Sequence, residues 1–184
     1  MNKHDEKVNA ELKDLYQEVI LDHNKKPRNF LKPIGTNCSA EGFNPLCGDK
    51  VNVYAVLDGD LVKDIGFQGS GCAISKSSNS IMTMMVKGKR RAEVDDLFEK
   101  FHGMITGKPH APVPPELGKL AVFSGVCEFP SRVKCAILGW HTLRAALAGK
   151  GDMVSTEQED HSLEEGKLKE TFEKEGPDGH HCAH

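Results

Sequence analysis

Two hydrophobic periods divide this chain of 184 residues into predicted helices and strands. Residues 51–56 and 62–67 alternate apolar and polar positions, and Asp58-Gly59 between them is a strong hairpin signal. A preceding strand near 35–42 would complete a three-stranded antiparallel meander. Residues 8–23 instead carry apolar side chains at the spacing of an amphipathic helix, namely Leu12, Leu15, Tyr16, Val19 and Ile20.

Helical patterns return after the predicted strands. They cover residues 72–86, 94–105, 115–122 and 131–148. Strands followed by helices predict an α+β fold, a three-stranded antiparallel sheet with helices packed on one face. Met82 and Trp140 are expected in the core between these layers, and His23 is expected to be a surface or capping residue.

Candidate chemistry lies where the predicted elements end. Cys47 and Asp49 are two positions apart around a glycine, so both can face the same side. Cys72 follows Gly-Ser-Gly at a predicted helix start, where the helix dipole favours a thiolate. Cys135 falls in the first turns of the last helix. The sequence therefore predicts a site at one tip of the fold, with three ordinary buried thiols as the alternative.

Thiolates beside one carboxylate suggest a metal centre. Sulfur donors suit zinc or iron-sulfur clusters, whereas an aspartate oxygen is a harder ligand and an unusual one for a closed structural zinc site. Purely structural zinc is therefore disfavoured.

At these residues the chain resembles the NifU/IscU-type family of iron-sulfur assembly proteins, and within it the SufU branch. The resemblance covers about residues 10–148. Its motifs are Leu15–His23, Lys26–Asn29, Asn44–Asp49, Leu57–Asp60, Phe67–Ser75 and Phe129–Ala136. Two features favour the SufU branch: scaffold members carry a histidine where this chain has Lys134, and they have a shorter segment between the second and third cysteines.

The resemblance implies a zinc-bound sulfur acceptor, a zinc-dependent sulfurtransferase. Its Zn²⁺ would be held by Cys47, Asp49, Cys72 and Cys135. Cys47 would become the persulfide, and Arg132 and Lys134 would compensate the negative charge of the ligands. The implied partners are a PLP-dependent cysteine desulfurase of the SufS type and a downstream SUF cluster-assembly scaffold.

A second interpretation uses the same four ligands. The protein would then be a non-enzymatic scaffold on which a transient [2Fe-2S] cluster is assembled and handed on. Because both interpretations use the same donors, the sequence leaves zinc and cluster open.

The composition of the chain indicates where the protein is located and which partners it lacks. The chain is 38% hydrophobic, enough for one core, and has neither an apolar stretch of membrane-spanning length nor a signal-peptide pattern. We therefore expect a cytoplasmic protein with no membrane partner. Scattered basic residues without interleaved aromatics predict no nucleic-acid binding.

Charge separates two segments. Residues 1–150 hold 21 basic and 17 acidic side chains, and residues 151–184 hold 3 and 10. We therefore expect one SufU/IscU-like domain over 1–150 and an acidic, disordered C-terminal tail over 151–184 that ends in a His/Cys cluster. That cluster can bind metal loosely or remain solvated. The roles of Cys38 and Cys127 stay open, either a thiol near the site or a small buried side chain.

Overall fold

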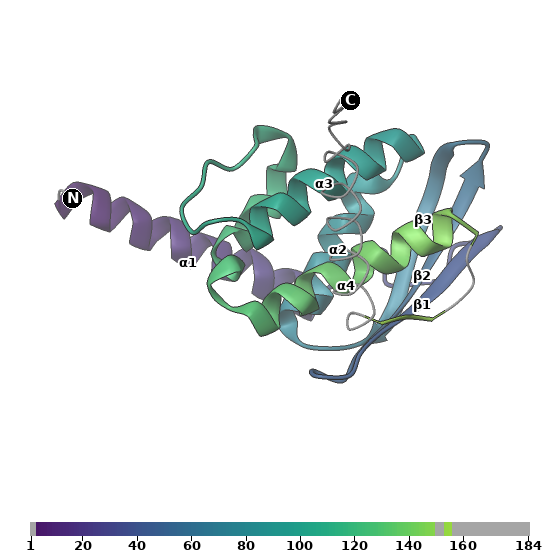
Figure 1. Cartoon of the computed structure of the whole chain (residues 1–184), viewed down its shortest axis with the longest axis horizontal. Helices are drawn as coiled ribbons and strands as arrows, with labels where there is room; N and C mark the ends of the chain where they lie inside the picture. The colour runs from purple at the N-terminus through teal and green to yellow at the C-terminus, as the bar shows by residue number, and fades with distance from the viewer. Residues whose placement is uncertain (1–2, 150–152, 156–184) are drawn as a thin grey trace, which may run out of the picture.

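The computed structural model describes residues 3–149 and 153–155 of the chain. A long helix, α1 (Lys3–Lys25), leads into the antiparallel strands β1 (Cys38–Asn44), β2 (Asp49–Asp58) and β3 (Leu61–Ser70). The helices α2 (Ala73–Val86), α3 (Arg91–Thr106) and α4 (Pro130–Leu147) follow, with a 3₁₀ segment, η1 (Pro115–Glu128), before α4. Figure 1 shows the helices gathered beside the sheet, with α4 lying across β1 and β2. The α+β fold class is confirmed.

The sheet has four strands in the order β3-β2-β1-β4. The predicted meander is present, and Gly59 turns between β2 and β3 with a φ of +61°. The fourth strand, β4 (Val154–Ser155), pairs in parallel with β1 and was not predicted. Two residues are too few to show a strand period, and they lie in the segment expected to be a disordered tail. Residues 156–184, where the rest of that prediction falls, lie outside the described residues.

The boundaries of three elements differ from prediction. The first helix begins at Lys3 rather than near residue 8, and β1 runs from Cys38 to Asn44 rather than from 35 to 42. The predicted helix over 115–122 is part of the longer 3₁₀ segment, which is interrupted at Gly118. The φ of +47° at Gly118 belongs to the left-handed region, which an α-helix of L-residues cannot continue through.

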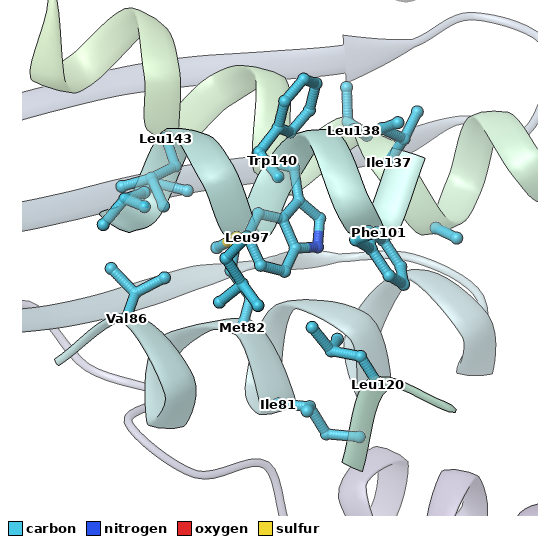
Figure 2. Packing of buried hydrophobic residues seen from close by; sticks show 14 of the residues in the cluster. Ile81, Met82, Val86, Leu97, Phe101, Leu120, Ile137, Leu138, Trp140 and Leu143 are labelled. Carbon is cyan, nitrogen blue, oxygen red and sulfur yellow. The ribbon is translucent and has the colours of Figure 1, made fainter. Parts of the chain in front are cut away.

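The core fills the space between the helices and the sheet. Trp140 and Met82 are fully buried there, as the helical pattern predicted, and the Trp140 ring lies 5.1 Å from that of Phe101. Figure 2 shows the side chains of α2, α3 and α4 converging on this tryptophan. Alternate residues of β2 are also buried, so the sheet turns one face to the helices. Core packing thereby fixes the strand and helix ends that carry the candidate donors.

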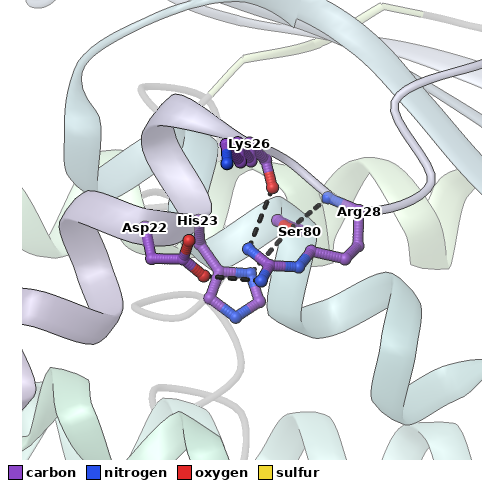
Figure 3. Close-up of polar contacts among 5 residues, drawn as sticks. All are labelled: Asp22, His23, Lys26, Arg28 and Ser80. Atoms are coloured by element: carbon purple, nitrogen blue, oxygen red, sulfur yellow. Dashed lines mark hydrogen bonds and ion pairs between the residues drawn. The ribbon is translucent and has the colours of Figure 1, made fainter.

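His23 was expected to be a surface or capping residue, but it is buried with only 3% of its surface exposed, so the surface position is wrong. Its Nδ1 lies 2.7 Å from Ser80 Oγ on α2, and the backbone N–H of Arg28 donates to the same oxygen over 2.8 Å. Figure 3 shows Arg28 also reaching back to Asp22 on α1. The motif around residues 15–29 thus includes a polar joint between α1 and α2, which a helical period cannot reveal.

No helix among the described residues 3–149 and 153–155 is long and apolar enough to cross a membrane.

Candidate metal centre

The four predicted donors come from three separate segments of the chain. Cys47 lies in the turn between β1 and β2, and Asp49 begins β2. Cys72 precedes the first residue of α2 as its N-cap, and Cys135 lies in the second turn of α4. The sheet register brings the start of β2 beside the end of β3, since Lys50 pairs with Ser70. All four residues therefore meet at one end of the sheet.

Three of these donors form a tight group. The ligand atoms of Cys47, Asp49 and Cys135 all lie within 4.8 Å of one another. The Cys47 and Cys135 sulfurs are 3.1 Å apart, well beyond the about 2.05 Å of a disulfide, and both are free thiols. Cys72 adjoins the group, with its sulfur 3.9 Å from Asp49 Oδ2. The arrangement brings three sulfur donors and one oxygen donor together.

Local backbone structure holds each donor in place. The Cys72 backbone N–H donates to Asp49 Oδ1 over 3.0 Å, which fixes the carboxylate against the start of α2. Gly71 has no side chain because a Cβ there would lie 2.9 Å from the same oxygen. Gly48 separates Cys47 from Asp49 with a φ of +70°, a conformation that favours glycine. Gly71 thus lets the backbone lie close to the Asp49 carboxylate, and Gly48 lets the chain turn between Cys47 and Asp49.

The donors differ in their exposure. Asp49 and Cys135 are each 1% exposed, Cys72 is half-buried, and Cys47 is exposed. Leu46, which precedes Cys47, exposes 64% of its surface, and Phe129, which precedes α4, exposes 58%. A molecule approaching this end of the protein would therefore meet the Cys47 thiol first.

The crowded thiols perturb one another. The pKa of Cys72 is lowered, first because the Cys135 thiol donates a hydrogen bond to it, and further because the Ser75 N–H at the start of α2 does so. The pKa of Cys135 is raised by the same bond to Cys72, by burial and by its contact with Cys47. A nearby positive charge would compensate the negative charge of an ionised Cys72.

Arg132 supplies part of that compensation. It precedes Cys135 by three residues, so the two side chains share one face of α4. The pKa of Arg132 is raised, chiefly by the charge of Cys72 and then by its contact with Cys135. Lys134 is half-buried, and helical geometry directs it about 200° around α4 from Arg132. Arg132 is thus a basic residue beside the sulfurs.

These residues fit a divalent metal by the chemistry of the donor set. Soft sulfur donors with one carboxylate suit zinc or an iron-sulfur cluster, and their mutual repulsion is what a bound cation relieves. Cys47, Asp49, Cys72 and Cys135 are the residues that would hold it.

Sequence reasoning missed one contact residue, Asn44. Its side chain is fully buried at the end of β1, its Nδ2 lies 3.9 Å from Cys135 Sγ, and its Oδ1 accepts the Leu46 N–H over 3.1 Å. Asn44 thereby ties the Cys47 turn to α4. It stands first in the motif Asn44–Asp49, and a polar residue at the buried end of a strand was the available signal.

The two remaining cysteines of the described chain are in separate surroundings. Cys38 begins β1 and packs against the core, at the far end of that strand from Asn44. Cys127 is half-buried in η1, where its thiol donates to the Ser124 carbonyl over 3.1 Å. Neither belongs to the group of converging donors found among the described residues.

A groove of about 910 Å³ lies beside this site, between α1, α3, the loop after α3 and η1. Arg132 and Phe129 form part of its lining, but none of the four donors, all within the described part of the chain, does so. The chemistry is therefore located by the converging donors rather than by the cavity.

Known proteins are similar to this chain in sequence and in fold. Residues 15–136 match the family described as NifU-like N terminal domain. The chain is 39% identical over 140 residues to the zinc-dependent sulfurtransferase SufU of Bacillus subtilis (strain 168), covering 76% of this chain and 94% of that protein. It is 35% identical over 158 residues to the iron-sulfur cluster assembly scaffold protein IscU of Streptococcus pyogenes serotype M1, covering 86% and 97%.

A solved structure supports the same relationship. The crystal structure of a candidate iron-sulfur cluster assembly scaffold protein for the SUF system, from Fervidobacterium islandicum AW-1, matches with a TM-score of 0.65 and 36% identity. The match covers 71% of this chain and 94% of that structure. Fold, family match and relatives agree, and the chain belongs to the NifU/IscU-type family of iron-sulfur cluster assembly proteins.

Proposed function

We propose that this protein is a zinc-bound sulfur acceptor of iron-sulfur cluster assembly in the cytoplasm. It takes persulfide sulfur from a PLP-dependent cysteine desulfurase of the SufS type and passes it to a downstream SUF scaffold. The observation that carries the proposal is the exposure of Cys47 beside the buried donors Asp49 and Cys135. One thiol faces an incoming partner while the other donors stay anchored.

The proposed reaction is a thiol-disulfide exchange on sulfur. The Cys47 thiolate attacks the outer sulfur of the desulfurase persulfide. A new sulfur-sulfur bond forms on Cys47, the bond in the desulfurase breaks, and the desulfurase cysteine leaves as a thiolate. Zinc, when bound by the four donors, would keep the thiols deprotonated at neutral pH.

The proposed reaction also requires a thiol that can face the partner, a positive charge near the sulfurs and a surface for docking. Gly48 gives the Cys47 turn the freedom to present its sulfur outward, whereas Cys72 and Cys135 are fixed at the starts of helices. Arg132 lies beside the sulfurs and would offset the negative charge that an arriving persulfide adds. The exposed Leu46, next to Cys47 in the chain, gives a docking partner apolar surface near the reacting thiol.

Mapping the persulfide tests the proposal. The protein is incubated with a cysteine desulfurase and cysteine, and its peptides are analysed by mass spectrometry without reductant. The added sulfur atom should map to Cys47 and should be absent from Cys47→Ala. Cys38→Ala, which removes a thiol at the far end of β1, is the matched control and should accept sulfur normally. A persulfide found mainly on Cys72, Cys127 or Cys135 would contradict the assignment.

A scaffold for a transient [2Fe-2S] cluster is the second candidate. The identity to a scaffold protein IscU over most of both chains favours it, and the same four donors could hold a cluster. Lys134 stands where scaffold members carry a histidine, which is why we place this candidate second.

A further inference from the structure

Helix α2 touches α4 close behind the metal centre. Ser78 on α2 donates a hydrogen bond of 2.6 Å to the backbone carbonyl of Ala136, the residue after Cys135, and this bond is buried. Cys72 is the N-cap of the same helix α2. The bond therefore joins the helix that presents Cys72 to the helix that carries Cys135.

A second contact between these helices is closer still. A Cβ atom on residue 139 would lie 1.5 Å from Asn79 Oδ1, so the asparagine oxygen occupies the place of that missing atom. Gly139 follows Cys135 by four residues, so the two lie on one face of α4. Any larger residue in place of Gly139 would have to displace the Asn79 side chain or α4 itself.

The amide oxygen of Asn79 is buried without a hydrogen-bond partner among the described residues. The residue is 3% exposed, and a buried carbonyl oxygen that accepts no hydrogen bond lowers the stability of a fold. The hydroxyls of Ser78 and Ser80, on either side, are buried too but have polar partners. What the oxygen does contact is Gly139, whose Cα hydrogen is a weak donor. Asn79 thus serves the approach of the two helices at the expense of its own hydrogen bonding.

Strand β1 restricts α4 from another direction. A Cβ atom on Gly42 would lie 2.1 Å from Thr142 Oγ1 on α4. Asn44, two residues further along β1, contacts Cys135. Because protein interiors are close-packed, α4 cannot shift away from α2 without changing these contacts. The position of the Cys135 sulfur, 3.1 Å from that of Cys47, therefore depends on how closely α2 and α4 approach.

We propose that Asn79 and Gly139 are positioning residues of the metal centre, whose contact sets the separation of α2 and α4 and so brings Cys72 and Cys135 to a spacing that one ion can bridge. Neither residue would touch the ion. The proposal rests on the proposed function only in taking the four donors as a zinc site, and no desulfurase enters its test. A failed sulfur transfer would leave it standing, and its own failure would leave the persulfide assignment untouched.

A reciprocal exchange of atoms between the helices tests the proposal. Gly139→Ala adds a carbon where the Asn79 oxygen lies, and Asn79→Ala removes that oxygen with the rest of the amide. In the double variant the added carbon fills part of the space that the amide leaves. Gly103→Ala, at a glycine of α3 with open space around it, is the matched control for the added methyl group. Val86→Ala, buried at the far end of α2, is the control for lost packing.

Two measurements compare the variants with the unaltered chain. Competition with a chelator gives the zinc affinity of the folded protein. Dibromobimane, which becomes fluorescent when it joins two thiols, gives the rate at which Cys47 and Cys135 are crosslinked in the metal-free protein, and peptide mapping identifies the joined pair. Circular dichroism shows that each variant is folded at the temperature used, and the denaturant midpoint records stability separately.

Each single change should weaken zinc binding by about tenfold or more, the usual effect of altering residues that orient metal ligands, and should slow the crosslinking severalfold. The double variant should recover most of both losses. Gly103→Ala should change neither measurement, and Val86→Ala should lower the denaturant midpoint alone.

Single variants that bind zinc and crosslink as the unaltered chain does would overturn the proposal. So would a double variant in which the two losses simply add, because independent sites behave in that way. If Gly139→Ala does not fold, the comparison of Asn79→Ala with the double variant decides the same question.

Discussion

Helix α4 holds two residues that are equally buried and differently surrounded. Trp140 and Cys135 lie five positions apart, with 0% and 1% of their surfaces exposed. The tryptophan packs among apolar side chains, including the Phe101 ring at 5.1 Å. The cysteine instead meets the Cys47 sulfur at 3.1 Å, the Ser131 carbonyl at 3.4 Å and the Asn44 amide at 3.9 Å. Burial alone does not separate core from site; the chemistry of the neighbours does.

The two regions also differ in whether they need a bound ion. The core around Trp140 is built mainly from apolar side chains, whose burial needs no added ligand. At the metal end, thiols and a carboxylate are packed closely enough to raise the pKa of Cys135, so that end favours a bound cation. We therefore expect core substitutions to reduce stability whatever the metal content, and site changes to act through the metal.

Two methionines on α2 test the expectation for the core, because one is buried and the other is exposed. Met82 is fully buried and Met84 is 40% exposed, two residues further along. Met82→Ala should lower the free energy of unfolding by about 2–5 kcal/mol, because it leaves a cavity. Met84→Ala should change it by less than about 0.5 kcal/mol. Denaturant unfolding of both variants measures the difference, and equal losses would show that the core is not where the structure has it.

Removing the metal from the site should lower the stability of the folded protein. A zinc ion that binds only the folded chain stabilises it by about 2.7 kcal/mol at a free concentration of 100 times its Kd. For a chain of this size that corresponds to a melting temperature higher by about 5–10 °C. Calorimetry before and after chelation measures the shift, with Cys38→Ser as a control that should keep it. An unchanged melting temperature after verified zinc removal would break the link between the metal and the fold.

Asp49→Asn tests the role of the carboxylate charge in the site, because the asparagine side chain has nearly the same size. Asp49→Asn keeps an acceptor for the Cys72 N–H but removes the hard, readily displaced carboxylate donor. The variant should keep part of its metal and accept sulfur about tenfold more slowly, a change of about 1.4 kcal/mol. Metal analysis and the rate of Cys47 persulfide formation give the two readouts. An Asn variant with the unaltered rate would make Asp49 a bystander to sulfur transfer.

The smallest expected effect concerns the polar joint at His23. Burial first, and then the charge of Arg28, lowers the pKa of His23, with Lys119 adding to the effect and Asp22 opposing it. The unfolded chain therefore takes up a proton near pH 6.5 that the folded chain does not, so stability should be full above that pH and decline as pH falls below it. His23→Gln, which can still bond Ser80, should flatten this slope. Unfolding curves between pH 5 and pH 8 measure it, and an equally steep slope in the variant would assign the acid sensitivity elsewhere.

The fold was predictable wherever the apolar residues follow the period of a strand or of a helix. Alternation gave β2 and β3, and helical spacing gave α2, α3 and α4 with Trp140 inside. The strand β4 is held by pairing with β1 rather than by its own pattern, and the interruption at Gly118 depends on a backbone angle that composition does not report. His23 was misplaced because its partner Ser80 lies 57 residues away.

The candidate donors were predictable as residue types at element ends, but their distances were not. That Cys47 and Cys135 lie in contact follows from how α4 crosses the sheet, which no local spacing encodes. Asn44 was missed for the same reason, since its role depends on a helix 91 residues away. That Arg132 lies beside the sulfurs likewise depends on how α4 packs.

Metal analysis of the purified protein tests the central claim most directly. The protein is isolated with and without oxygen exclusion, and its zinc, iron and sulfide contents are read beside its visible spectrum. A zinc-bound sulfur acceptor should be colourless under both conditions and hold about one zinc per chain at Cys47, Asp49, Cys72 and Cys135. Near-stoichiometric iron and sulfide with visible charge-transfer absorption in the anaerobic sample would contradict this account and establish the cluster scaffold instead.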